Sequence, residues 1–299
     1  MCRAAAALAK SPSYWTVSFS GAGHLLPYHL GAARSLLASQ VGLHNEPERV
    51  FATAPLGLPV RAVAGSSSGA IAAAVMALLP HRLEEYADRF LQDRGHALRN
   101  LTCMLQEETS VASEETRRSS LPLTICTTKC SDGSMQLFDF PDEKRDLPYL
   151  LHTIQASCTI PPTFHPYDII SSRPLSYPQE GAIKIDGFHY VDGGIAAPAP
   201  PTPFDMDVNS HRIVISPLSG GHSASECSIR PRDTSWSLPW DITASRDRSF
   251  RIRPSVQNLQ ALLGSIGAAS PAVLKKWYDR GTQDAEWFLN DWNQRFLKS

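Results

Sequence analysis

The sequence predicts an α/β fold with a mainly parallel central sheet. Short β-prone segments alternate with helical ones along most of the chain, a pattern typical of parallel strands joined by helices. The first two expected strands each lead into a run of small residues, at 21–23 and 65–69, that suits a tight turn. With 299 residues, 42% of them hydrophobic, the chain fits one large domain or two small ones.

The expected strands are short and apolar. They span residues 15–20, 60–64, 121–127, 135–138, 188–191 and 212–215. Residues 131–134 (Ser-Asp-Gly-Ser) are a turn sequence, so the third and fourth strands are expected to pair as a hairpin.

The expected helices follow the apolar periodicity. They span residues 25–39, 70–79, 81–94 and 147–157, and two more fill the tail, one from Ser270-Pro271 and one after Gly281-Thr282. In the last helix, an apolar stripe recurs at Ala285, Phe288, Leu289, Trp292 and Phe296, which predicts packing on the sheet. Residues 45–59 are expected to form a connection, 106–120 a mobile linker or the base of a lid, and 220–248 an irregular segment.

The run Gly65-Ser66-Ser67-Ser68-Gly69 is a G-x-S-x-G sequence between a predicted strand and a predicted helix. In this setting the central serine, Ser67, occupies a sharp and strained turn with its hydroxyl exposed. Gly65 and Gly69 remove side chains that would clash there. The helix N-terminus beside Ser67 favours developing negative charge, so the segment suits a nucleophile for acyl transfer. The alternative is a small-residue turn that packs a helix onto the sheet.

Two further glycine-rich turns follow expected strands. Gly21-Ala22-Gly23 offers backbone amides without bulky side chains, which suits an oxyanion hole. Asp192-Gly193-Gly194 suits a carboxylate held at a tight turn. Because the ends of strands in an open α/β sheet converge on one crevice, we expect both turns to lie near Ser67.

These three segments and their surroundings resemble the patatin-like phospholipase family, and within it the adipose triglyceride lipase and adiponutrin branch. The likeness extends through residues 18–23, 28–33, 156–161, 190–194, 215–220 and 273–292. The resemblance implies a three-layer α/β/α fold with a helical C-terminal extension. It also implies a Ser67-Asp192 dyad, with Ser67 as nucleophile, Asp192 as its base, and amides of Gly21, Ala22 and Gly23 around the oxyanion.

The resemblance further implies hydrolysis of triacylglycerol or glycerophospholipid esters through an acyl-serine intermediate. No metal or organic cofactor is implied. Two departures leave a catalytically weak lipid-binding protein open as an alternative: Leu25 and Leu26 replace a basic residue and a glycine, and residues 195–198 lack the usual asparagine. A second alternative is an esterase for soluble esters that uses His211 or His222, which follow Asp192 in the order of ordinary α/β-hydrolases.

Charge and composition limit the classes of partner and the cellular location expected for this protein. The net charge is −1 with no basic run, so no nucleic acid is expected. The six cysteines lack paired metal-ligand spacing and are interpreted as reduced thiols of an intracellular, cytoplasmic protein. No segment is apolar and long enough to span a membrane, so the expected association with a membrane or lipid droplet is peripheral. Trp236 and Trp240 lie in an irregular loop and suit either lipid contact or packing.

The expected organisation has three parts. Residues 1–13 are predicted to be a flexible tail, residues 14–220 the patatin-like catalytic domain, and residues 221–299 an irregular connection and C-terminal helices packed on that domain.

Overall fold

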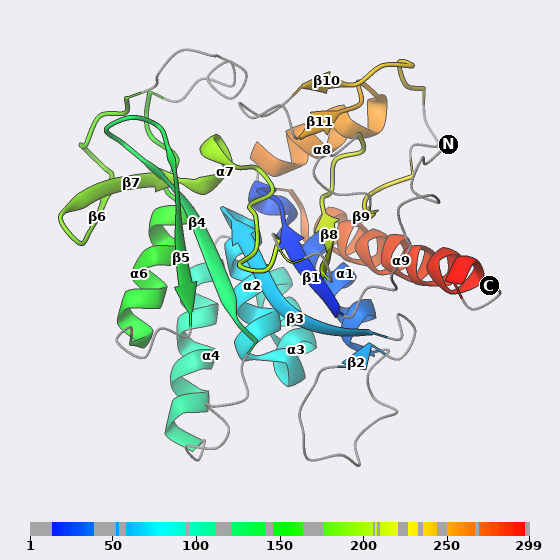
Figure 1. Cartoon of the computed structure of the whole chain (residues 1–299), viewed down its shortest axis with the longest axis horizontal. Coiled ribbons are helices and arrows are strands. Elements are labelled where there is room, and N and C mark those ends of the chain that lie inside the picture. Colours follow the sequence, from blue (N-terminus) through cyan, green and yellow to red (C-terminus); the bar gives the residue numbers. More distant parts are fainter. Residues whose placement is uncertain are drawn as a thin grey trace.

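The computed structural model describes residues 14–38, 52–53, 58–93, 96–111, 121–140, 146–163, 176–205, 207, 210–220, 227–232, 236–243, 250–266 and 269–296. Its centre is a mixed sheet of nine strands, in the order β6-β7-β4-β3-β1-β8-β9, with β2 beside β3 and β5 beside β4 (Figure 1). The strands are β1 Tyr14–Phe19, β2 Ala52–Thr53, β3 Leu58–Ser66, β4 Leu123–Lys129, β5 Met135–Phe140, β6 Ile183–Ile185, β7 Phe188–Asp192, β8 Ser210–Ile215 and β9 Cys227–Ile229. β4, β3, β1, β8 and β9 run parallel, which confirms the mainly parallel sheet.

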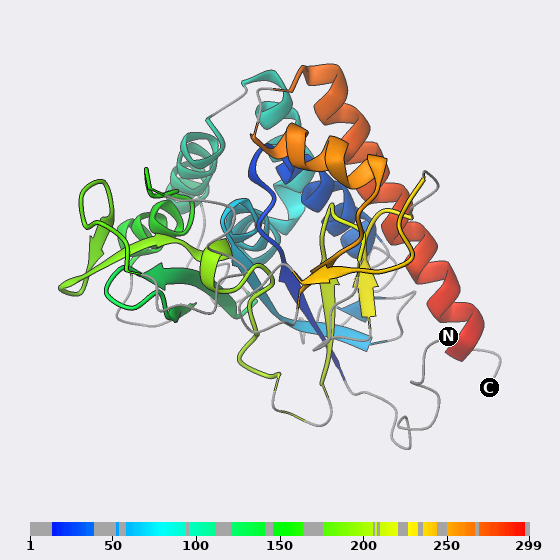
Figure 2. The same ribbon diagram turned by 90° about the horizontal axis from the view of Figure 1, so that it is seen from above.

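The long helices gather on one side of this sheet (Figure 2). They are α1 Leu26–Ala38, α2 Ser68–Leu78, α3 Leu83–Gln92, α4 Ala97–Val111, α6 Leu147–Ser157, α8 Val256–Ile266 and α9 Pro271–Phe296, with short helical turns η2 Gly23–Leu25, η3 Pro80–Arg82 and α7 Gly193–Ala196. Because side chains alternate between the two faces of β1, every second residue of this strand faces these helices. Trp15 packs edge-on against Trp292 of α9, with ring centroids 4.6 Å apart, and Phe19 packs against His29 of α1. This is the packing role predicted for the stripe on the last helix.

The other face of the sheet is covered differently. Ser18 of β1 points away from the helices and donates its hydroxyl to Pro200 O at 2.7 Å. Ser66 of β3 donates in the same way to Pro198 O at 2.8 Å. In the described residues this face is therefore covered by the short helix α7 and the coil of residues 197–205. The short polar side chains of β1 and β3 anchor that coil through its carbonyls.

The junction of β3 and β7 explains how distant segments meet. β3 runs parallel to β4 and pairs its last residue, Ser66, with Cys126. β7 runs antiparallel to β4 and pairs its last residue, Asp192, with Thr127. The opposite edge of β4 is occupied by β5, so β3 and β7 share one edge and run toward each other along it. Their ends meet at neighbouring positions of β4.

The C-terminal extension is one continuous helix, which corrects the predicted break at Gly281-Thr282. Gly281 lies inside α9, where a Cβ would come within 2.0 Å of Tyr28 O in α1. Gly31 of α1 is equally close to Tyr278 O. The glycines thus let the two helices approach closely, and Thr282 bonds both Gly31 O and Tyr278 O. The helix-breaking character of Gly281 is outweighed by this packing.

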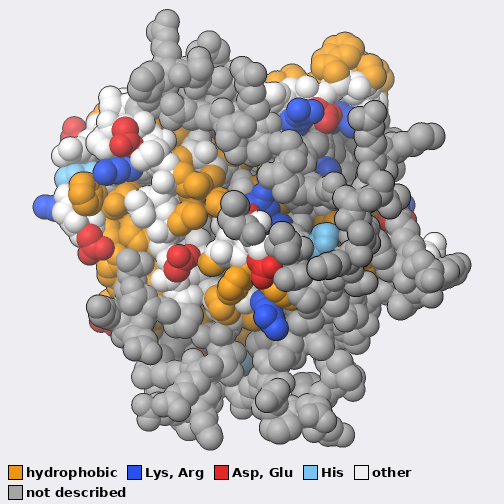
Figure 3. Space-filling model, in the orientation of Figure 1, with side chains coloured by type: hydrophobic (Ala, Val, Ile, Leu, Met, Phe, Trp, Pro, Cys, Tyr) orange, Lys and Arg blue, Asp and Glu red, His pale blue; other side chains and the backbone are white. Residues whose placement is uncertain are grey.

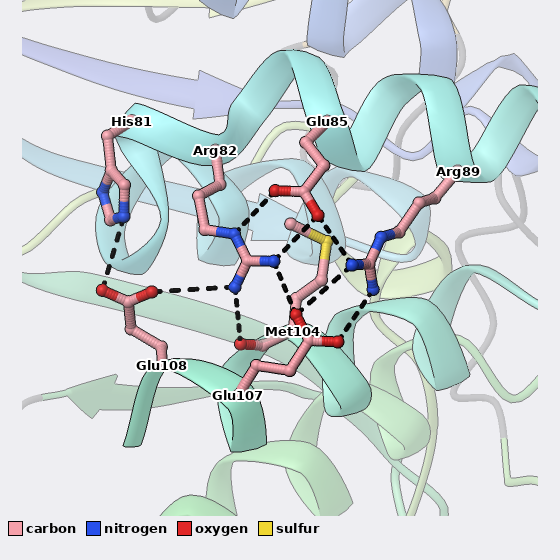
Figure 4. Close-up of polar contacts among 7 residues, drawn as sticks. All are labelled: His81, Arg82, Glu85, Arg89, Met104, Glu107 and Glu108. Atoms are coloured by element: carbon pink, nitrogen blue, oxygen red, sulfur yellow. Dashed lines mark hydrogen bonds and ion pairs between the residues drawn. The ribbon is translucent and has the colours of Figure 1, made fainter. Parts of the chain in front are cut away.

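An ion-pair network joins α3 to α4 (Figure 4). Arg82 donates to Glu85 at 2.8 Å and to Glu107 at 2.6 Å, and Arg89 donates to the same two carboxylates. Hydrogen bonds from Arg82, followed by the nearby positive charge, lower the pKa of Glu85 to about 2. α4 continues to Val111, so the first part of the predicted mobile linker at 106–120 is helical. Residues 112–120 lie outside the described residues.

We expect Arg82→Ala to lower the free energy of unfolding by about 1 kcal/mol, because it removes bonds to two carboxylates and to Met104 O from a mostly buried guanidinium. Urea denaturation measures the change, which should shrink at high salt. Lys275→Ala is the control, since it removes an exposed pair with Asp279 and a cation–π contact with Tyr278, both within α9. An equal loss in both variants would contradict the network's contribution.

The predicted hairpin is confirmed as β4 and β5. The irregular segment contains β9 and β10 (Ile242–Thr243), which pairs with β11 (Arg251–Ile252), and α8 follows where no separate helix was expected. Residues 1–13 lie outside the described residues, and the division at residue 220 stays a prediction. None of the described helices combines the length and apolar character needed to cross a membrane.

Candidate active site

Ser67 stands at the turn between β3 and α2 and is strained. Its φ is 53° and its ψ −133°, a region that non-glycine residues rarely adopt. The glycines on each side make this turn possible. A Cβ on Gly65 would lie 2.1 Å from Gly69 O, and one on Gly69 would lie 2.4 Å from Phe19 O. Ser66 and Ser68 are buried while Ser67 is partly exposed, as expected for a nucleophile elbow.

Ser157, the last residue of α6, clamps this turn to the sheet. Its hydroxyl accepts the Ser67 amide at 2.9 Å and donates to Cys126 O at 2.6 Å. A single buried side chain thus fixes the backbone of Ser67 relative to β4. Sequence reasoning missed this role, because Ser157 was noticed only as part of a family-like segment, 156–161. A serine at the end of an apolar helix carries no chemical signal of its own.

Asp192 ends β7 and faces Ser67. Ser67 Oγ donates to Asp192 Oδ2 at 2.7 Å, and the Gly194 amide donates to Asp192 Oδ1 at 2.8 Å. Gly193 permits this turn, because a Cβ there would lie 2.0 Å from Cys126 O. The Thr128 hydroxyl holds the strand end through Asp192 O at 2.7 Å. The two residues singled out from the sequence are therefore in direct contact.

The environment of Asp192 makes it a better base than an ordinary carboxylate. Its side chain is 5% exposed, and burial raises its pKa from 3.8 to about 6, although the bonds from Ser67 and Gly194 act in the opposite direction. At neutral pH most of the carboxyl is ionised and able to accept a proton. Its acceptor atom already receives the Ser67 hydroxyl, which is the geometry that general-base chemistry needs.

The glycine turn at 21–23 lies beside Ser67 and Asp192, but two of its three amides already bond acceptors within the protein. The Gly21 amide donates to Pro198 O at 2.9 Å, and the Ala22 amide donates to Ser68 Oγ at 3.1 Å. Both are therefore occupied and are withdrawn as oxyanion donors in this conformation. Gly21 lies directly beside the nucleophile, since a Cβ on it would be in van der Waals contact with Ser67 Cβ at 3.4 Å.

Two kinds of amide remain for an oxyanion. Gly23 has a φ of 51°, is exposed, and donates to no acceptor within the described part of the chain. At the start of α2, Ala70 is the first amide with an acceptor, Ser67 O at 2.9 Å, so the amides of Ser68 and Gly69 precede the helical bonds. The helix dipole favours negative charge at that end.

No histidine in the described part of the chain takes part in the contact between Ser67 and Asp192. His29 is fully buried, bonds Ser20 O through Nε2 at 2.7 Å, and has its pKa lowered to about 4 by burial. It braces the carbonyl that precedes the glycine turn. His211 pairs with Trp15 at the start of the parallel strands, whereas Ser67 follows their ends. His222 lies outside the described residues. In the described chain, no three metal-ligating side chains gather in a suitable cluster.

Comparison with known proteins assigns the chain to a protein family. A sequence profile described as patatin-like phospholipase matches residues 17–205, which is more than half of the chain and includes both Ser67 and Asp192. The chain belongs to the patatin-like phospholipase family. Patatin-like phospholipase domain-containing protein 2 of Rattus norvegicus is 28% identical over 92% of this chain, and its Mus musculus counterpart 27% over the same share.

The chain spans about half of these relatives, 51% and 50% of their length respectively. Among solved structures, VipD from Legionella pneumophila aligns with a TM-score of 0.47 and 10% identity, covering 94% of this chain and 67% of that one. This is a distant likeness.

The patatin-like chain fills its two unusual positions with core residues. Leu25 and Leu26 are each 1% exposed, so they pack inward and leave the surface of the turn to Gly23 and His24. After the Asp-Gly-Gly turn, Ile195 is buried and the Ala196 amide donates to Thr128 Oγ1 at 3.1 Å. Residues 195–198, which lack the usual asparagine, therefore still hold the Asp-Gly-Gly turn in place.

Proposed function

We propose that this patatin-like phospholipase is a lipid acyl hydrolase whose nucleophile is Ser67 and whose base is Asp192. The observation that carries the proposal is the 2.7 Å bond from Ser67 Oγ to Asp192 Oδ2 at a strained strand-to-helix turn. The substrates are carboxylic esters of triacylglycerol or glycerophospholipid. The family supports hydrolysis of lipids in general, and the identity of 26–28% to the curated relatives supports assignment to the adipose triglyceride lipase and adiponutrin branch.

The proposed reaction has two halves, formation and hydrolysis of an acyl-serine. In each half, Asp192 takes up one proton and then gives it back. Ser67 Oγ attacks the ester carbonyl as its proton passes to Asp192 Oδ2. The tetrahedral intermediate then collapses, and the proton moves to the departing alcohol, which leaves acyl-Ser67. Asp192 next takes a proton from water, the hydroxide attacks the acyl carbonyl, and Ser67 Oγ recovers the proton as the fatty acid leaves. We assign the oxyanion to the amide of Gly23, which belongs to the predicted trio, and to that of Ser68, which takes the place of Gly21 and Ala22.

A catalytically weak, lipid-binding protein is the second candidate. One observation favours it: the amides of Gly21 and Ala22 are engaged, so fewer donors face an oxyanion than the sequence predicted. Because one such donor is worth about 3 kcal/mol of transition-state stabilisation, two donors in place of the three predicted lower the rate about a hundredfold. Labelling with a fluorophosphonate probe separates the candidates. A folded protein that takes no label at Ser67 would favour the second.

We expect kcat/KM for a soluble ester to fall below pH 6, about tenfold for each pH unit, as Asp192 takes up a proton. The pKa of Asp192 is raised to about 6, so the active carboxylate form dominates above that value and is lost below it. Steady-state kinetics between pH 4.5 and pH 8 measure this acid limb of the pH profile of kcat/KM. A rate that stays constant down to pH 4.5, in protein that circular dichroism shows to be folded, would contradict Asp192 as the base.

The test of substrate class is an activity panel of emulsified triacylglycerol, phospholipid vesicles and a soluble short-chain ester. We expect one of the two lipid substrates to be hydrolysed faster than the soluble ester. Preference for the soluble ester would contradict a lipid substrate while leaving the hydrolase assignment in place.

A further inference from the structure

We propose that α8 and the coil before it form a docking surface for phospholipid bilayers with anionic headgroups, placed beside the candidate active site. The proposal rests on the proposed function only for its purpose, which is to present lipid to Ser67. The surface is an apolar patch of eight exposed side chains. Its members are Trp236, Trp240, Ile242, Val256, Leu259, Leu262, Leu263 and Ile266. Figure 3 shows hydrophobic side chains projecting above β10 and β11, with charged side chains next to them.

α8 presents one apolar face to solvent. Its exposed members recur every three or four residues, and Leu259, Leu263 and Ile266 are 58%, 64% and 80% exposed. No residue from 256 to 266 carries a charge. A helix with so much exposed aliphatic surface and no charge is typical of contact with an apolar phase or partner.

The helix is firmly attached, so the exposed face is a property of the folded protein. Asn258 is 2% exposed; its side chain accepts the Ser219 amide at 2.9 Å and donates to Ser219 O and Arg253 O. Ala261, on the opposite face, is fully buried. The coil is tied to α8 as well, because the Val256 amide donates to Trp236 O at 3.3 Å.

The patch adjoins the candidate active site through the glycine turn. A Cβ on Gly23 would lie 2.3 Å from Ser265 O, and one on Gly264 would lie 3.2 Å from Leu25 Cδ2. Ala261 packs in one cluster with Ala22 and Leu25. α8 therefore forms the wall beside the turn that carries a proposed oxyanion donor, and a surface bound by α8 would lie at the rim of the site.

Charges around the patch favour an anionic lipid surface over a second copy of the chain. Arg251, in β11, and Lys276, near the start of α9, are exposed and have no carboxylate partner among the described residues. The carboxylates nearby that the structure describes are paired, Asp241 with Arg253 at 3.0 Å and Asp279 with Lys275. A symmetric contact between two such patches brings like charges together, whereas anionic headgroups complement them. The exposed indoles of Trp236 and Trp240 suit the interface between water and lipid.

The test is co-sedimentation of the full chain with vesicles of phosphatidylcholine containing phosphatidylserine. It uses Ser67→Ala protein, so that turnover plays no part. We expect Leu263→Gln with Ile266→Gln to weaken binding about tenfold or more, because it removes two aliphatic chains without changing charge. Arg251→Gln should weaken binding to these vesicles and leave the weaker binding to pure phosphatidylcholine unchanged. Phe188→Gln is the control, another exposed apolar residue (51%), on β7 near the far edge of the sheet.

Thermal unfolding measured by circular dichroism confirms that each variant is folded. Equal vesicle binding by the α8 variant and the Phe188 control would overturn the proposal, as would equal binding to neutral and anionic vesicles. Dimerisation of the parent protein that the α8 substitutions abolish, without vesicle binding, would assign the patch to a second copy. Labelling of wild-type Ser67 by a fluorophosphonate tests the proposed function separately, so either idea can fail without the other.

Discussion

Ser67→Ala is expected to abolish hydrolysis of every ester in the activity panel, by up to about 10⁶-fold in kcat, and to remove fluorophosphonate labelling. The reason is that no neighbouring hydroxyl can replace Ser67. Ser66 Oγ is buried and donates to Pro198 O on the far face of the sheet, while Ser68 Oγ accepts the Ala22 amide. Ser67 is the only one of the three whose oxygen contacts Asp192.

Ser66→Ala is the matched control for this prediction. It removes a hydroxyl one residue away and one anchor of the coil at Pro198, which leaves the Ser67-Asp192 contact in place. We expect its stability to fall by about 1 kcal/mol while labelling at Ser67 persists. Residual turnover in folded Ser67→Ala protein comparable to wild type would refute Ser67 as the nucleophile.

Asp192→Asn is expected to lower kcat by about 10³-fold and at the same time to stabilise the fold. The loss follows because an amide cannot accept the Ser67 proton, and a general base contributes 10²–10⁴ to rate. The variant gains stability because a buried carboxylate is costly to ionise and a neutral amide avoids that cost. Its pKa is about 6 in the folded protein against 3.8 ordinarily, a difference of about 2 units that corresponds to about 3 kcal/mol when the group is fully ionised.

The pH dependence of this stabilisation has a definite sign. Because the folded protein holds the Asp192 proton more tightly than the unfolded chain does, the free energy of unfolding rises as pH falls from about 6 toward 4. The ionised group therefore destabilises the wild type most above pH 6. We expect urea denaturation to find the Asn variant more stable at pH 8 and similar to wild type near pH 4. A variant that is less stable at pH 8 would contradict this account.

The local features of the site were predictable because they depend on short-range chemistry. A strand, a glycine-flanked serine and an apolar helix in succession predict an elbow, and the positive φ of Ser67 bears this out. The contact between Ser67 and Asp192 was expected from converging parallel strands, but the structure achieves it differently. β7 is antiparallel and meets β3 end to end along β4. Strand direction depends on long-range pairing, which a local pattern does not encode.

The remaining differences have similar causes. Gly281 predicted a break in the C-terminal helix, but its value lies in close contact with Tyr28 of α1, a partner far away in the sequence. α8 was missed although its apolar residues recur at helical spacing, and the sequence alone does not show that this apolar face is exposed to solvent. The amides of Gly21 and Ala22 were expected to be free, and only the positions of Pro198 and Ser68 reveal that they are occupied.

The most direct test of the account is the rate of fluorophosphonate labelling at Ser67, located by mass spectrometry, in three proteins at pH 7.5. Direct transfer of the Ser67 proton to Asp192 predicts rapid labelling of the wild type, rapid labelling when His211 and His222 are both replaced by Ala, and loss of labelling in folded Asp192→Asn. The opposite pattern, with labelling kept in the Asn variant and lost in the folded double histidine variant, would contradict the dyad and identify an imidazole as the base.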